Sequence, residues 1–230
     1  MHQSIDKKFK LFFYLILFIF LSTQIAKNNS IGQKYTNVSN IEIKGLSKEN
    51  NLKVYESLKF LLAKSVFFIS EKDFQNILKG NNLIESFYIK KIYPNLIRID
   101  IKQADLIAIT NQGNKKFYIG SNGKLISKKL IKGPTNKLPF VYSKSNYIDF
   151  IKLKRIIDKS EFRFEEIESF YYFPSNRWDI KTKDGFLIKL PVNNISESLQ
   201  LAKIVKKSKK LKKKNIIDLR ISNKVIISNE

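Results

Sequence analysis

Hydrophobic and polar positions divide this chain into one continuous apolar run and a longer region in which they alternate. The run is residues 11–26, sixteen residues without a charged side chain. Beyond it, apolar positions recur with the two-residue period of half-buried strands or at the three- and four-residue spacing of helices that pack on one side. The pattern predicts an N-terminal hydrophobic helix followed by a folded α+β region of about 200 residues.

The apolar run 11–26 is bounded by Lys10 and Lys27. At about 1.5 Å rise per residue it reaches about 24 Å, short of the roughly 30 Å hydrocarbon core. Lysine flanks can close that gap, because their alkyl stems lie along apolar surface while the ammonium groups reach the headgroups. We expect an uncleaved transmembrane helix. A buried core helix and a cleaved signal peptide are alternatives, although cleavage after Ala26 would put Gln24 where a small residue is needed.

The orientation of this predicted anchor follows from the basic residues Lys7, Lys8 and Lys10. Short positive flanks stay on the cytoplasmic side of a bilayer. Residues 1–10 are therefore predicted to be a cytoplasmic tail, and the bulk of the chain is predicted to lie outside. Residues 27–39 are polar and turn-rich, which is typical of a linker.

The first folded segment is predicted to contain a strand, two helices and two more strands. Residues 40–44 alternate apolar with polar and end at Gly45, which is a strand running into a turn. Ser47 is a candidate N-cap for the first helix. The apolar face of that helix is predicted to comprise Leu52, Tyr55, Leu58, Leu61 and Leu62.

The second helix has its own start and stop signals. Ser70 followed three residues later by Asp73 is close to a capping box, and Gly80 is a stop signal. Residues 87–92 and 97–101 then read as strands joined by a turn that contains Pro94.

The second half of the chain predicts strands with two helical interruptions. Two hairpins are indicated by Asn122-Gly123 and Asp184-Gly185, dipeptides that favour tight turns. The expected strands are residues 117–119, 124–126, 138–142, 168–173, 178–182, 186–191, 215–221 and 224–228, and the expected helices are 149–159 and 195–207. This order predicts a mostly antiparallel β domain.

The element order and several motifs resemble the FtsQ/DivIB family of bacterial division proteins. Residues 84–94 follow the apolar-x-x-small-x-apolar-x-basic-x-x-Pro pattern of the family's POTRA module, although Phe87 stands at the small position. Gln103 and Leu106 stand where the family usually has Glu and Pro. The closing strands resemble the family's apolar-Asp-apolar-Arg strand that turns into a last apolar strand. The resemblance implies a single-pass anchor, a POTRA domain at 40–106 and a β domain at 107–230.

Composition supports a folded protein that does not depend on disulfides. Hydrophobic residues make up 43% of the chain and aromatic residues 13%, and there is no cysteine. The net charge of +23 comes from lysine more than arginine. The densest cluster, Lys206–Lys214, contains no aromatic residue, unlike single-strand nucleic-acid binders. We expect no nucleic-acid binding, and interpret the cluster as a solvated helix end, with contact to a membrane surface or partner as the alternative.

Residue inventory argues against catalysis. The single histidine is His2, in the predicted cytoplasmic tail, so no exported histidine can act as a base or metal ligand. No thiol nucleophile, glycine-rich phosphate loop or serine-nucleophile motif is found. The carboxylates Glu161, Glu165, Glu166 and Glu168 cluster on a polar segment typical of a charged surface. We expect no enzyme activity, cofactor, metal or small-molecule substrate.

The last strand suggests a binding mechanism. A chain that ends on a short apolar strand tends to leave it at a sheet edge, where another protein's strand can pair with it. The resemblance implies that bitopic FtsB/FtsL-type partners bind here. The matching residues are Ile221, Lys224, Val225, Ile226 and Ile227. The alternative is that Ile221 and Ile226 are ordinary core residues.

Two functions follow from these expectations. The first is a divisome scaffold in the inner membrane, with its bulk in the periplasm, located at the septum and linking early and late division proteins. The second is a periplasmic POTRA factor that binds unfolded outer-membrane protein segments by strand addition.

Overall fold

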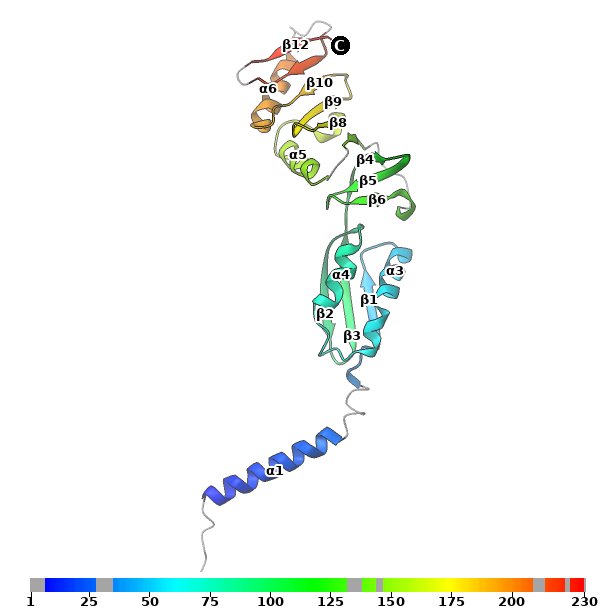
Figure 1. Ribbon diagram of the computed structural model, residues 1–230, viewed down its shortest axis with the longest axis vertical. Helices are drawn as coiled ribbons and strands as arrows, with labels where there is room; N and C mark the ends of the chain where they lie inside the picture. The colour runs from blue at the N-terminus through cyan, green and yellow to red at the C-terminus, as the bar shows by residue number, and fades with distance from the viewer. Residues whose placement is uncertain are drawn as a thin grey trace, which may run out of the picture. The chain divides into compact units, whose positions relative to one another are not determined.

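The computed structural model describes residues 7–27, 35–131, 138–143, 147–208, 214–221 and 224–229. It divides into two compact units, residues 1–80 with 87–101 and residues 81–86 with 102–230. Figure 1 shows the succession of elements in each unit. The start of the predicted tail, much of the predicted linker and the centre of the lysine cluster lie outside the described residues.

The N-terminal helix α1 (Lys7–Lys27) takes in the whole apolar run. Its large apolar side chains from Phe9 to Leu21 are between 43% and 73% exposed. No helix among the residues that the structure describes is both long enough and apolar enough to cross a membrane. The span expected at residues 11–26 therefore stays a prediction.

The first unit contains a small sheet with two helices. Its elements are β1 (Asn40–Lys44), α3 (Lys48–Leu58), the 3₁₀ helix η1 (Lys59–Ala63), α4 (Lys72–Gly80), β2 (Ile84–Ile92) and β3 (Leu96–Gln103). The strand order is β1-β3-β2, and β1 runs parallel to β3 with Ile41 opposite Ile97 and Ile43 opposite Ile99. The predicted order of strand, helix, helix, strand, strand is confirmed.

Both helices of this sheet begin where the sequence predicts. The Ser47 hydroxyl accepts a hydrogen bond from the Asn50 N–H at 3.4 Å and caps α3. Before α4, the Ser70 N–H donates to the Asp73 carboxylate at 2.7 Å, which satisfies one of the free donors at a helix start. This bond is the main cause that lowers the pKa of Asp73 to about 2.

The core of this unit lies between the helices and one face of the sheet. Ile97 and Ile99 are fully buried and Ile101 is nearly so, as their alternation predicts. The predicted apolar face of α3 was wrong at Leu52, which is 57% exposed. The prediction is confirmed at Leu58 and Leu61, which are fully buried, and the buried stripe also takes in Asn50 and Val54, which were not predicted.

The second unit is built on one nine-stranded sheet. Its strands are β4 (Leu106–Gln112), β5 (Lys115–Gly120), β6 (Leu125–Ser127), β7 (Phe140–Tyr142), β8 (Ile167–Phe173), β9 (Arg177–Thr182), β10 (Leu187–Lys189), β11 (Ile216–Asp218) and β12 (Ile226–Ser228). The strand order is β12-β11-β10-β9-β8-β7-β4-β5-β6. Within the described residues, five neighbouring pairs are antiparallel and three are parallel, so the sheet is mixed with an antiparallel majority.

Strand β4 was not predicted from the sequence. It pairs with β5 through a hairpin whose turn contains Gly113 at φ 56°. The apolar run Leu106–Thr110 followed by a glycine-containing turn is the signal that could have revealed it. The two hairpins that the sequence did predict, β5–β6 and β9–β10, are confirmed, with Gly123 and Gly185 at positive φ in their turns.

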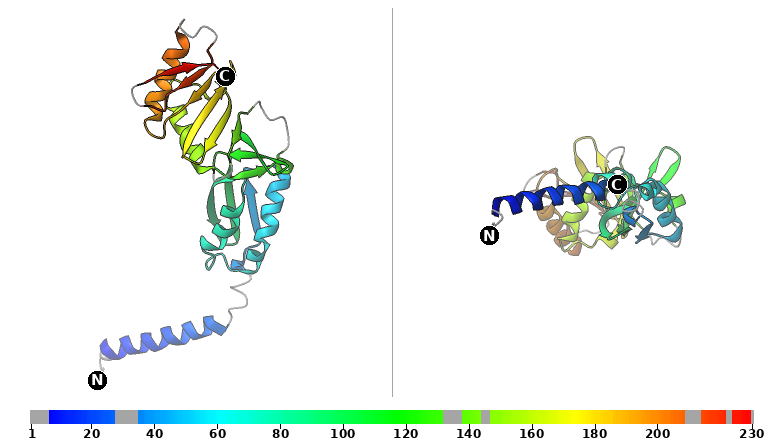
Figure 2. Two further views of the ribbon diagram at one scale, coloured as in Figure 1. Left: turned by 45° about the horizontal axis from the view of Figure 1, so that its top comes forward. Right: turned by 90° about the horizontal axis from the view of Figure 1, so that it is seen from below.

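Two helices cover one face of the sheet, α5 (Ile148–Asp158) and α6 (Ile195–Lys207), as Figure 2 shows. Both were predicted within one residue. Beneath them a single row of fully buried side chains crosses five neighbouring strands. The row is formed by Val141, Phe170, Ile180, Ile188 and Ile217. Ile227 of β12, opposite Ile217, continues this row at the edge and is half-buried.

Candidate partner-binding site

The last strand, β12, lies at the end of the nine-stranded sheet, and in the described part of the chain it pairs with β11 alone. In this antiparallel pair Ile216 lies opposite Ser228 and Asp218 opposite Ile226. The Ser228 carbonyl accepts a bond from the N–H of Asn215, directly before β11, at 3.2 Å, so Ser228 and Ile226 direct their main-chain groups inward.

Main-chain groups alternate in direction along a strand, so those of Ile227 point away from β11. Val225 comes directly before β12, and we expect it to follow the same alternation. The Lys214 side chain agrees with this assignment, because its Nζ atom donates to the Ile227 carbonyl at 3.4 Å. A lysine that covers an exposed edge is a common device against uncontrolled strand pairing. An incoming strand would have to displace this ammonium group.

The five residues predicted from the sequence divide into two groups. Ile221 is 52% exposed, Ile226 is 46% exposed and Lys224 is exposed. The alternative that Ile221 and Ile226 are core residues is therefore wrong. Val225 and Ile227 lean toward the core and are half-buried. To a partner strand, Val225 and Ile227 thus offer main-chain groups. Ile221, Lys224 and Ile226 offer exposed side chains.

A hollow of about 420 Å³ lies beside this edge, where β11 ends and α6 begins. Its lining brings together the predicted Ile221 and Lys224 with Val192, Leu201 and Arg220. Sequence reasoning missed Val192 and Leu201, which are 51% and 38% exposed. Leu201 could have been suspected, because it lies outside the buried stripe of α6, next to Ala202.

Charged side chains form a row on the open face of the sheet next to the edge. Lys189 lies between Asp179 and Asp218 in the strand register. The Arg220 Nε atom is 2.8 Å from the Asp218 Oδ1 atom, and this contact is the main cause that lowers the pKa of Asp218. Asp179 is 4% exposed, and burial raises its pKa although Arg177 opposes that shift. Such alternating charges favour a partner whose charges are of opposite sign at each facing position.

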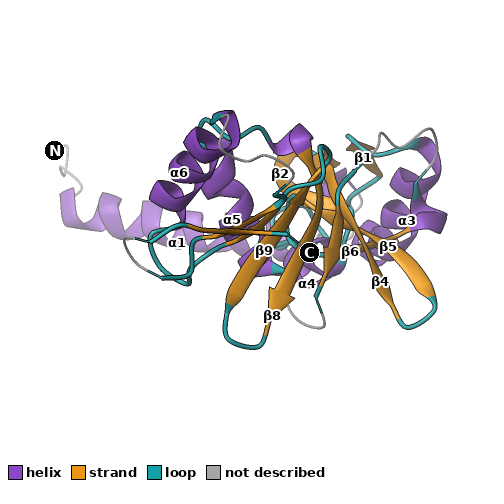
Figure 3. Cartoon of the chain, turned by 90° about the horizontal axis from the view of Figure 1, so that it is seen from above, coloured by secondary structure: helices purple, strands orange, loops and turns teal. Residues whose placement is uncertain are grey.

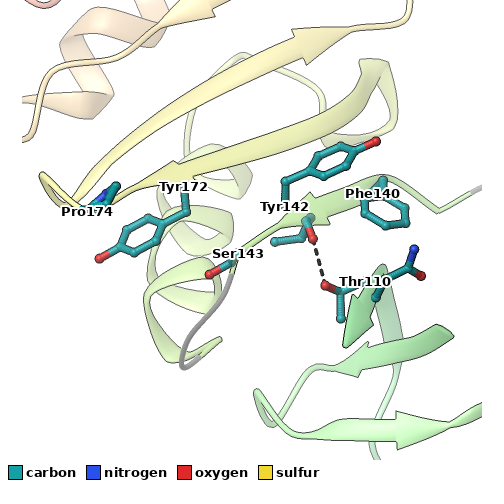
Figure 4. Close-up of a pocket in the computed structure, with 8 residues that line it drawn as sticks. Thr110, Phe140, Tyr142, Ser143, Tyr172 and Pro174 are labelled. Atoms are coloured by element: carbon teal, nitrogen blue, oxygen red, sulfur yellow. Dashed lines mark hydrogen bonds between the residues drawn. The ribbon is translucent and has the colours of Figure 1, made fainter. Parts of the chain in front are cut away.

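A second hollow of about 660 Å³ opens between β4 and β7 (Figure 4). These strands pair only where Ile109 lies opposite Phe140, and the Thr110 hydroxyl then donates to the Val141 carbonyl at 2.9 Å in place of a main-chain bond. Beyond this point the β4–β5 and β8–β9 hairpins diverge (Figure 3). The lining consists of aromatic rings, hydroxyl groups, an amide and a proline, including Tyr142 and Tyr172.

Three of the four carboxylates in the acidic cluster predicted to be a charged surface are ion-pair partners. Glu161 pairs with Lys203 at 2.9 Å, Glu166 with Arg163 at 3.0 Å, and Glu168 lies 3.9 Å from Lys181. In the described ranges no group of three or more histidine, cysteine, aspartate or glutamate side chains is close enough to hold a metal ion.

The lysine cluster is described only at its two ends. Lys206 is not the freely solvated side chain that we expected, because its Nζ atom lies 2.8 Å from Asp184 and over the rings of Phe162 and Phe186. Lys207 is exposed. Two lysines were predicted to flank the membrane anchor. Lys10 is exposed, and the structure does not describe the side chain of Lys27.

A small strand-helix-helix-strand-strand module followed by a mixed sheet with an open final strand defines a POTRA-containing protein with an extra β domain. Comparison with family models gives the same division. Residues 36–103 match the POTRA domain of FtsQ type, and residues 108–220 match the C-terminal domain of cell division protein FtsQ/DivIB. The chain belongs to the FtsQ/DivIB family of cell division proteins.

Two relatives found by sequence agree with this assignment. The chain is 29% identical over 192 residues to the cell division protein FtsQ of Rickettsia bellii, covering 83% of this chain and 71% of that protein. It is 27% identical over 233 residues to FtsQ of Rickettsia felis, covering 96% and 85%. A solved extracytoplasmic domain of DivIB from Geobacillus stearothermophilus shares 14% identity, with a TM-score of 0.34 over 47% of this chain and 99% of that one.

Proposed function

We propose that this chain is a non-enzymatic divisome scaffold that links early and late division proteins by binding bitopic FtsB/FtsL-type partners through β12. One observation carries the proposal: β12 ends the sheet with the main-chain groups of Ile227 directed outward, and Val225 directly before it is expected to continue that alternation. Strand addition at such an edge gains affinity from main-chain hydrogen bonds and selectivity from alternate side chains.

The surroundings of the edge support a selective docking site. Ile221 and Ile226 offer exposed apolar contact beside the hollow at the end of β11. Arg220 and Lys224 offer positive charge to a partner with acidic residues, although Arg220 is partly neutralised by Asp218. Apolar contact in the centre with charge at the rim is the usual anatomy of a selective interface.

The proposed location is the inner membrane at the division septum, with residues 11–26 as a single-pass anchor, the N-terminus inside and the bulk in the periplasm. The uncharged length of this segment and its lysine flanks support the anchor. A scaffold tethered in this way meets other single-pass proteins in two dimensions, which raises their effective concentration at the binding edge.

Depletion in live cells, together with fluorescent tagging, tests the function. The full chain should gather at mid-cell and co-purify with the bitopic pair, and its depletion should produce filamentous cells. Normal division after depletion would refute the scaffold role. Weak capture of many unrelated β-rich peptides, without the bitopic pair, would favour the alternative of a periplasmic factor for outer-membrane protein segments.

A further inference from the structure

One end of the first unit carries an exposed aromatic surface. Main-chain hydrogen bonds of 2.8–3.0 Å tie the entry segment 35–39 to the loop 64–68 and to the turn 93–95. The chain therefore enters the unit at the same end as this loop and turn. The opposite end is formed by the C-terminal end of β1 and the start of α3.

Aromatic side chains gather at the entry end. The exposed fraction is 68% for Tyr35, 47% for Phe60, 57% for Phe67, 85% for Phe68 and 58% for Tyr93. These are five of the seven exposed aromatic side chains that the structure describes after α1. Single exposed apolar residues are ordinary on a protein surface, but a concentration of this kind marks an interaction site.

The two phenylalanines are held outward by the packing of their neighbours. Val66 and Ile69, on either side of them in sequence, are 0% and 2% exposed. These buried neighbours fix the loop and leave Phe67 and Phe68 at its tip. The Phe67 ring stacks on Tyr93 with 5.0 Å between the centroids. The tip is thus a supported structure that directs apolar rings into the surroundings.

The length of the connection to α1 says what lies near this tip. Seven residues separate Lys27, the end of α1, from Tyr35. At about 3.3–3.6 Å per residue, eight steps of fully extended chain reach at most about 26–29 Å. If residues 11–26 span the inner membrane, as proposed above, the entry end is held within that distance of the periplasmic face of that membrane.

Two of the lysines beside the aromatic rings are held in ion pairs. Lys59 pairs with Glu56 at 2.7 Å, and Lys64 pairs with Asp73 at 2.9 Å. The Lys90–Lys91 pair, shortly before the turn 93–95, adds positive charge at this end, so the salt response of the test separates ring insertion from attraction to anionic headgroups. Tyrosine rings concentrate at membrane interfaces, and phenylalanine side chains insert just below them.

We infer that the entry end of this unit docks on the bilayer, with the rings at the tip of loop 64–68 seated in the headgroup region. This inference rests on the proposed membrane anchor. Docking would fix the orientation of the first unit over the membrane.

The absence of cysteine makes a direct test simple, because one introduced cysteine gives a unique label. Phe68→Cys carries a small polarity-sensitive fluorophore in the full chain, reconstituted into phosphatidylethanolamine/phosphatidylglycerol vesicles that contain nitroxide-labelled lipid. The matched control is Lys48→Cys, an exposed position at the opposite end of the unit, about 16 Å away along the length of β1. We expect at least threefold stronger quenching at position 68, unchanged in 0.5 M salt (about 3 Å to 5 Å screening length).

A second variant separates ring insertion from mere closeness to the membrane. Phe67→Ser, which removes the neighbouring ring, should reduce quenching at position 68 by half or more. A label at position 68 that is shielded from water but not quenched would indicate packing against a second copy and overturn the inference. Vesicles that float with the chain but leave the label unquenched would also overturn it, with the anchor intact. A chain that does not float would refute the anchor and the inference together.

Discussion

Proline at position 225 is the sharpest test of the binding edge. Val225 precedes β12 and takes no part in its pairing with β11, and by the alternation along the strand we expect its main-chain N–H to point away from β11. Proline removes this donor and places a ring where a partner strand would lie. The apolar body of the side chain is largely kept, so its packing against the core should survive.

The expected magnitude follows from the groups involved. A partner strand can form up to four main-chain hydrogen bonds with Val225 and Ile227, each contributing roughly 0.5–1.5 kcal/mol net. Loss of one bond together with the steric conflict should weaken binding by about 1–3 kcal/mol. That range corresponds to a rise in Kd of about 5-fold to 150-fold.

The assay is binding of the full chain, in nanodiscs, to the immobilised extracytoplasmic segments of an FtsB/FtsL-type pair. Val225→Ala is the matched control, because it keeps the N–H while it shortens the side chain. Trp178 is the single tryptophan and lies in the same unit, so its fluorescence reports whether each variant is folded.

Two results would refute the reasoning. Unchanged affinity in Val225→Pro would mean that no strand adds at this edge. An equal loss in Val225→Ala would mean that side-chain packing is what matters. Lys214→Ala adds an independent check, since freeing the Ile227 carbonyl should leave affinity unchanged or raise it by up to about threefold, the effect of a weak exposed contact.

Three further predictions concern stability. Gly45→Ala should destabilise the first unit by about 3 kcal/mol or more, measured by thermal unfolding, because a Cβ atom would lie 1.7 Å from the Ile101 carbonyl oxygen at φ +110°; a variant as stable as the parent would contradict this. Phe150→Ala should cost the second unit about 3–5 kcal/mol in urea unfolding followed by Trp178 fluorescence, since its fully buried ring contacts that indole; a loss under 1 kcal/mol would show that the core closes around the cavity. Because the folded pKa of Asp73 is lowered from 3.8 to about 2, its stabilising contribution is complete above about pH 4 and lost as the pH falls through 2. Asp73→Asn should flatten the dependence of stability on pH in that window, and an unaltered profile would contradict the assignment.

Local signals explain why so much of the fold followed from the sequence. The caps at Ser47 and Ser70, the stop at Gly80 and the turn glycines 123 and 185 act within a few residues, so their effect does not depend on distant packing. Both helices of the second unit followed from the same kind of short-range periodicity.

Side-chain direction was less secure. Leu52 has the right spacing for a buried face, yet it is exposed because the sheet meets α3 along a neighbouring stripe. Lys206 belongs to a run that looks solvated, but Asp184 and two phenylalanine rings draw it onto the surface. Both outcomes depend on segments distant in sequence.

What the sequence by itself determined is the set of elements apart from β4, their order and the residues of the last strand, because these depend on period, capping and turn chemistry. Only the tertiary structure decided the pairing order of the nine strands, which leaves β12 outermost and turns Ile227 outward. It also decided that Phe67 and Phe68 project while Val66 and Ile69 are buried. Strand order and exposure are set by which distant segments pack together, and a local pattern carries no record of that choice.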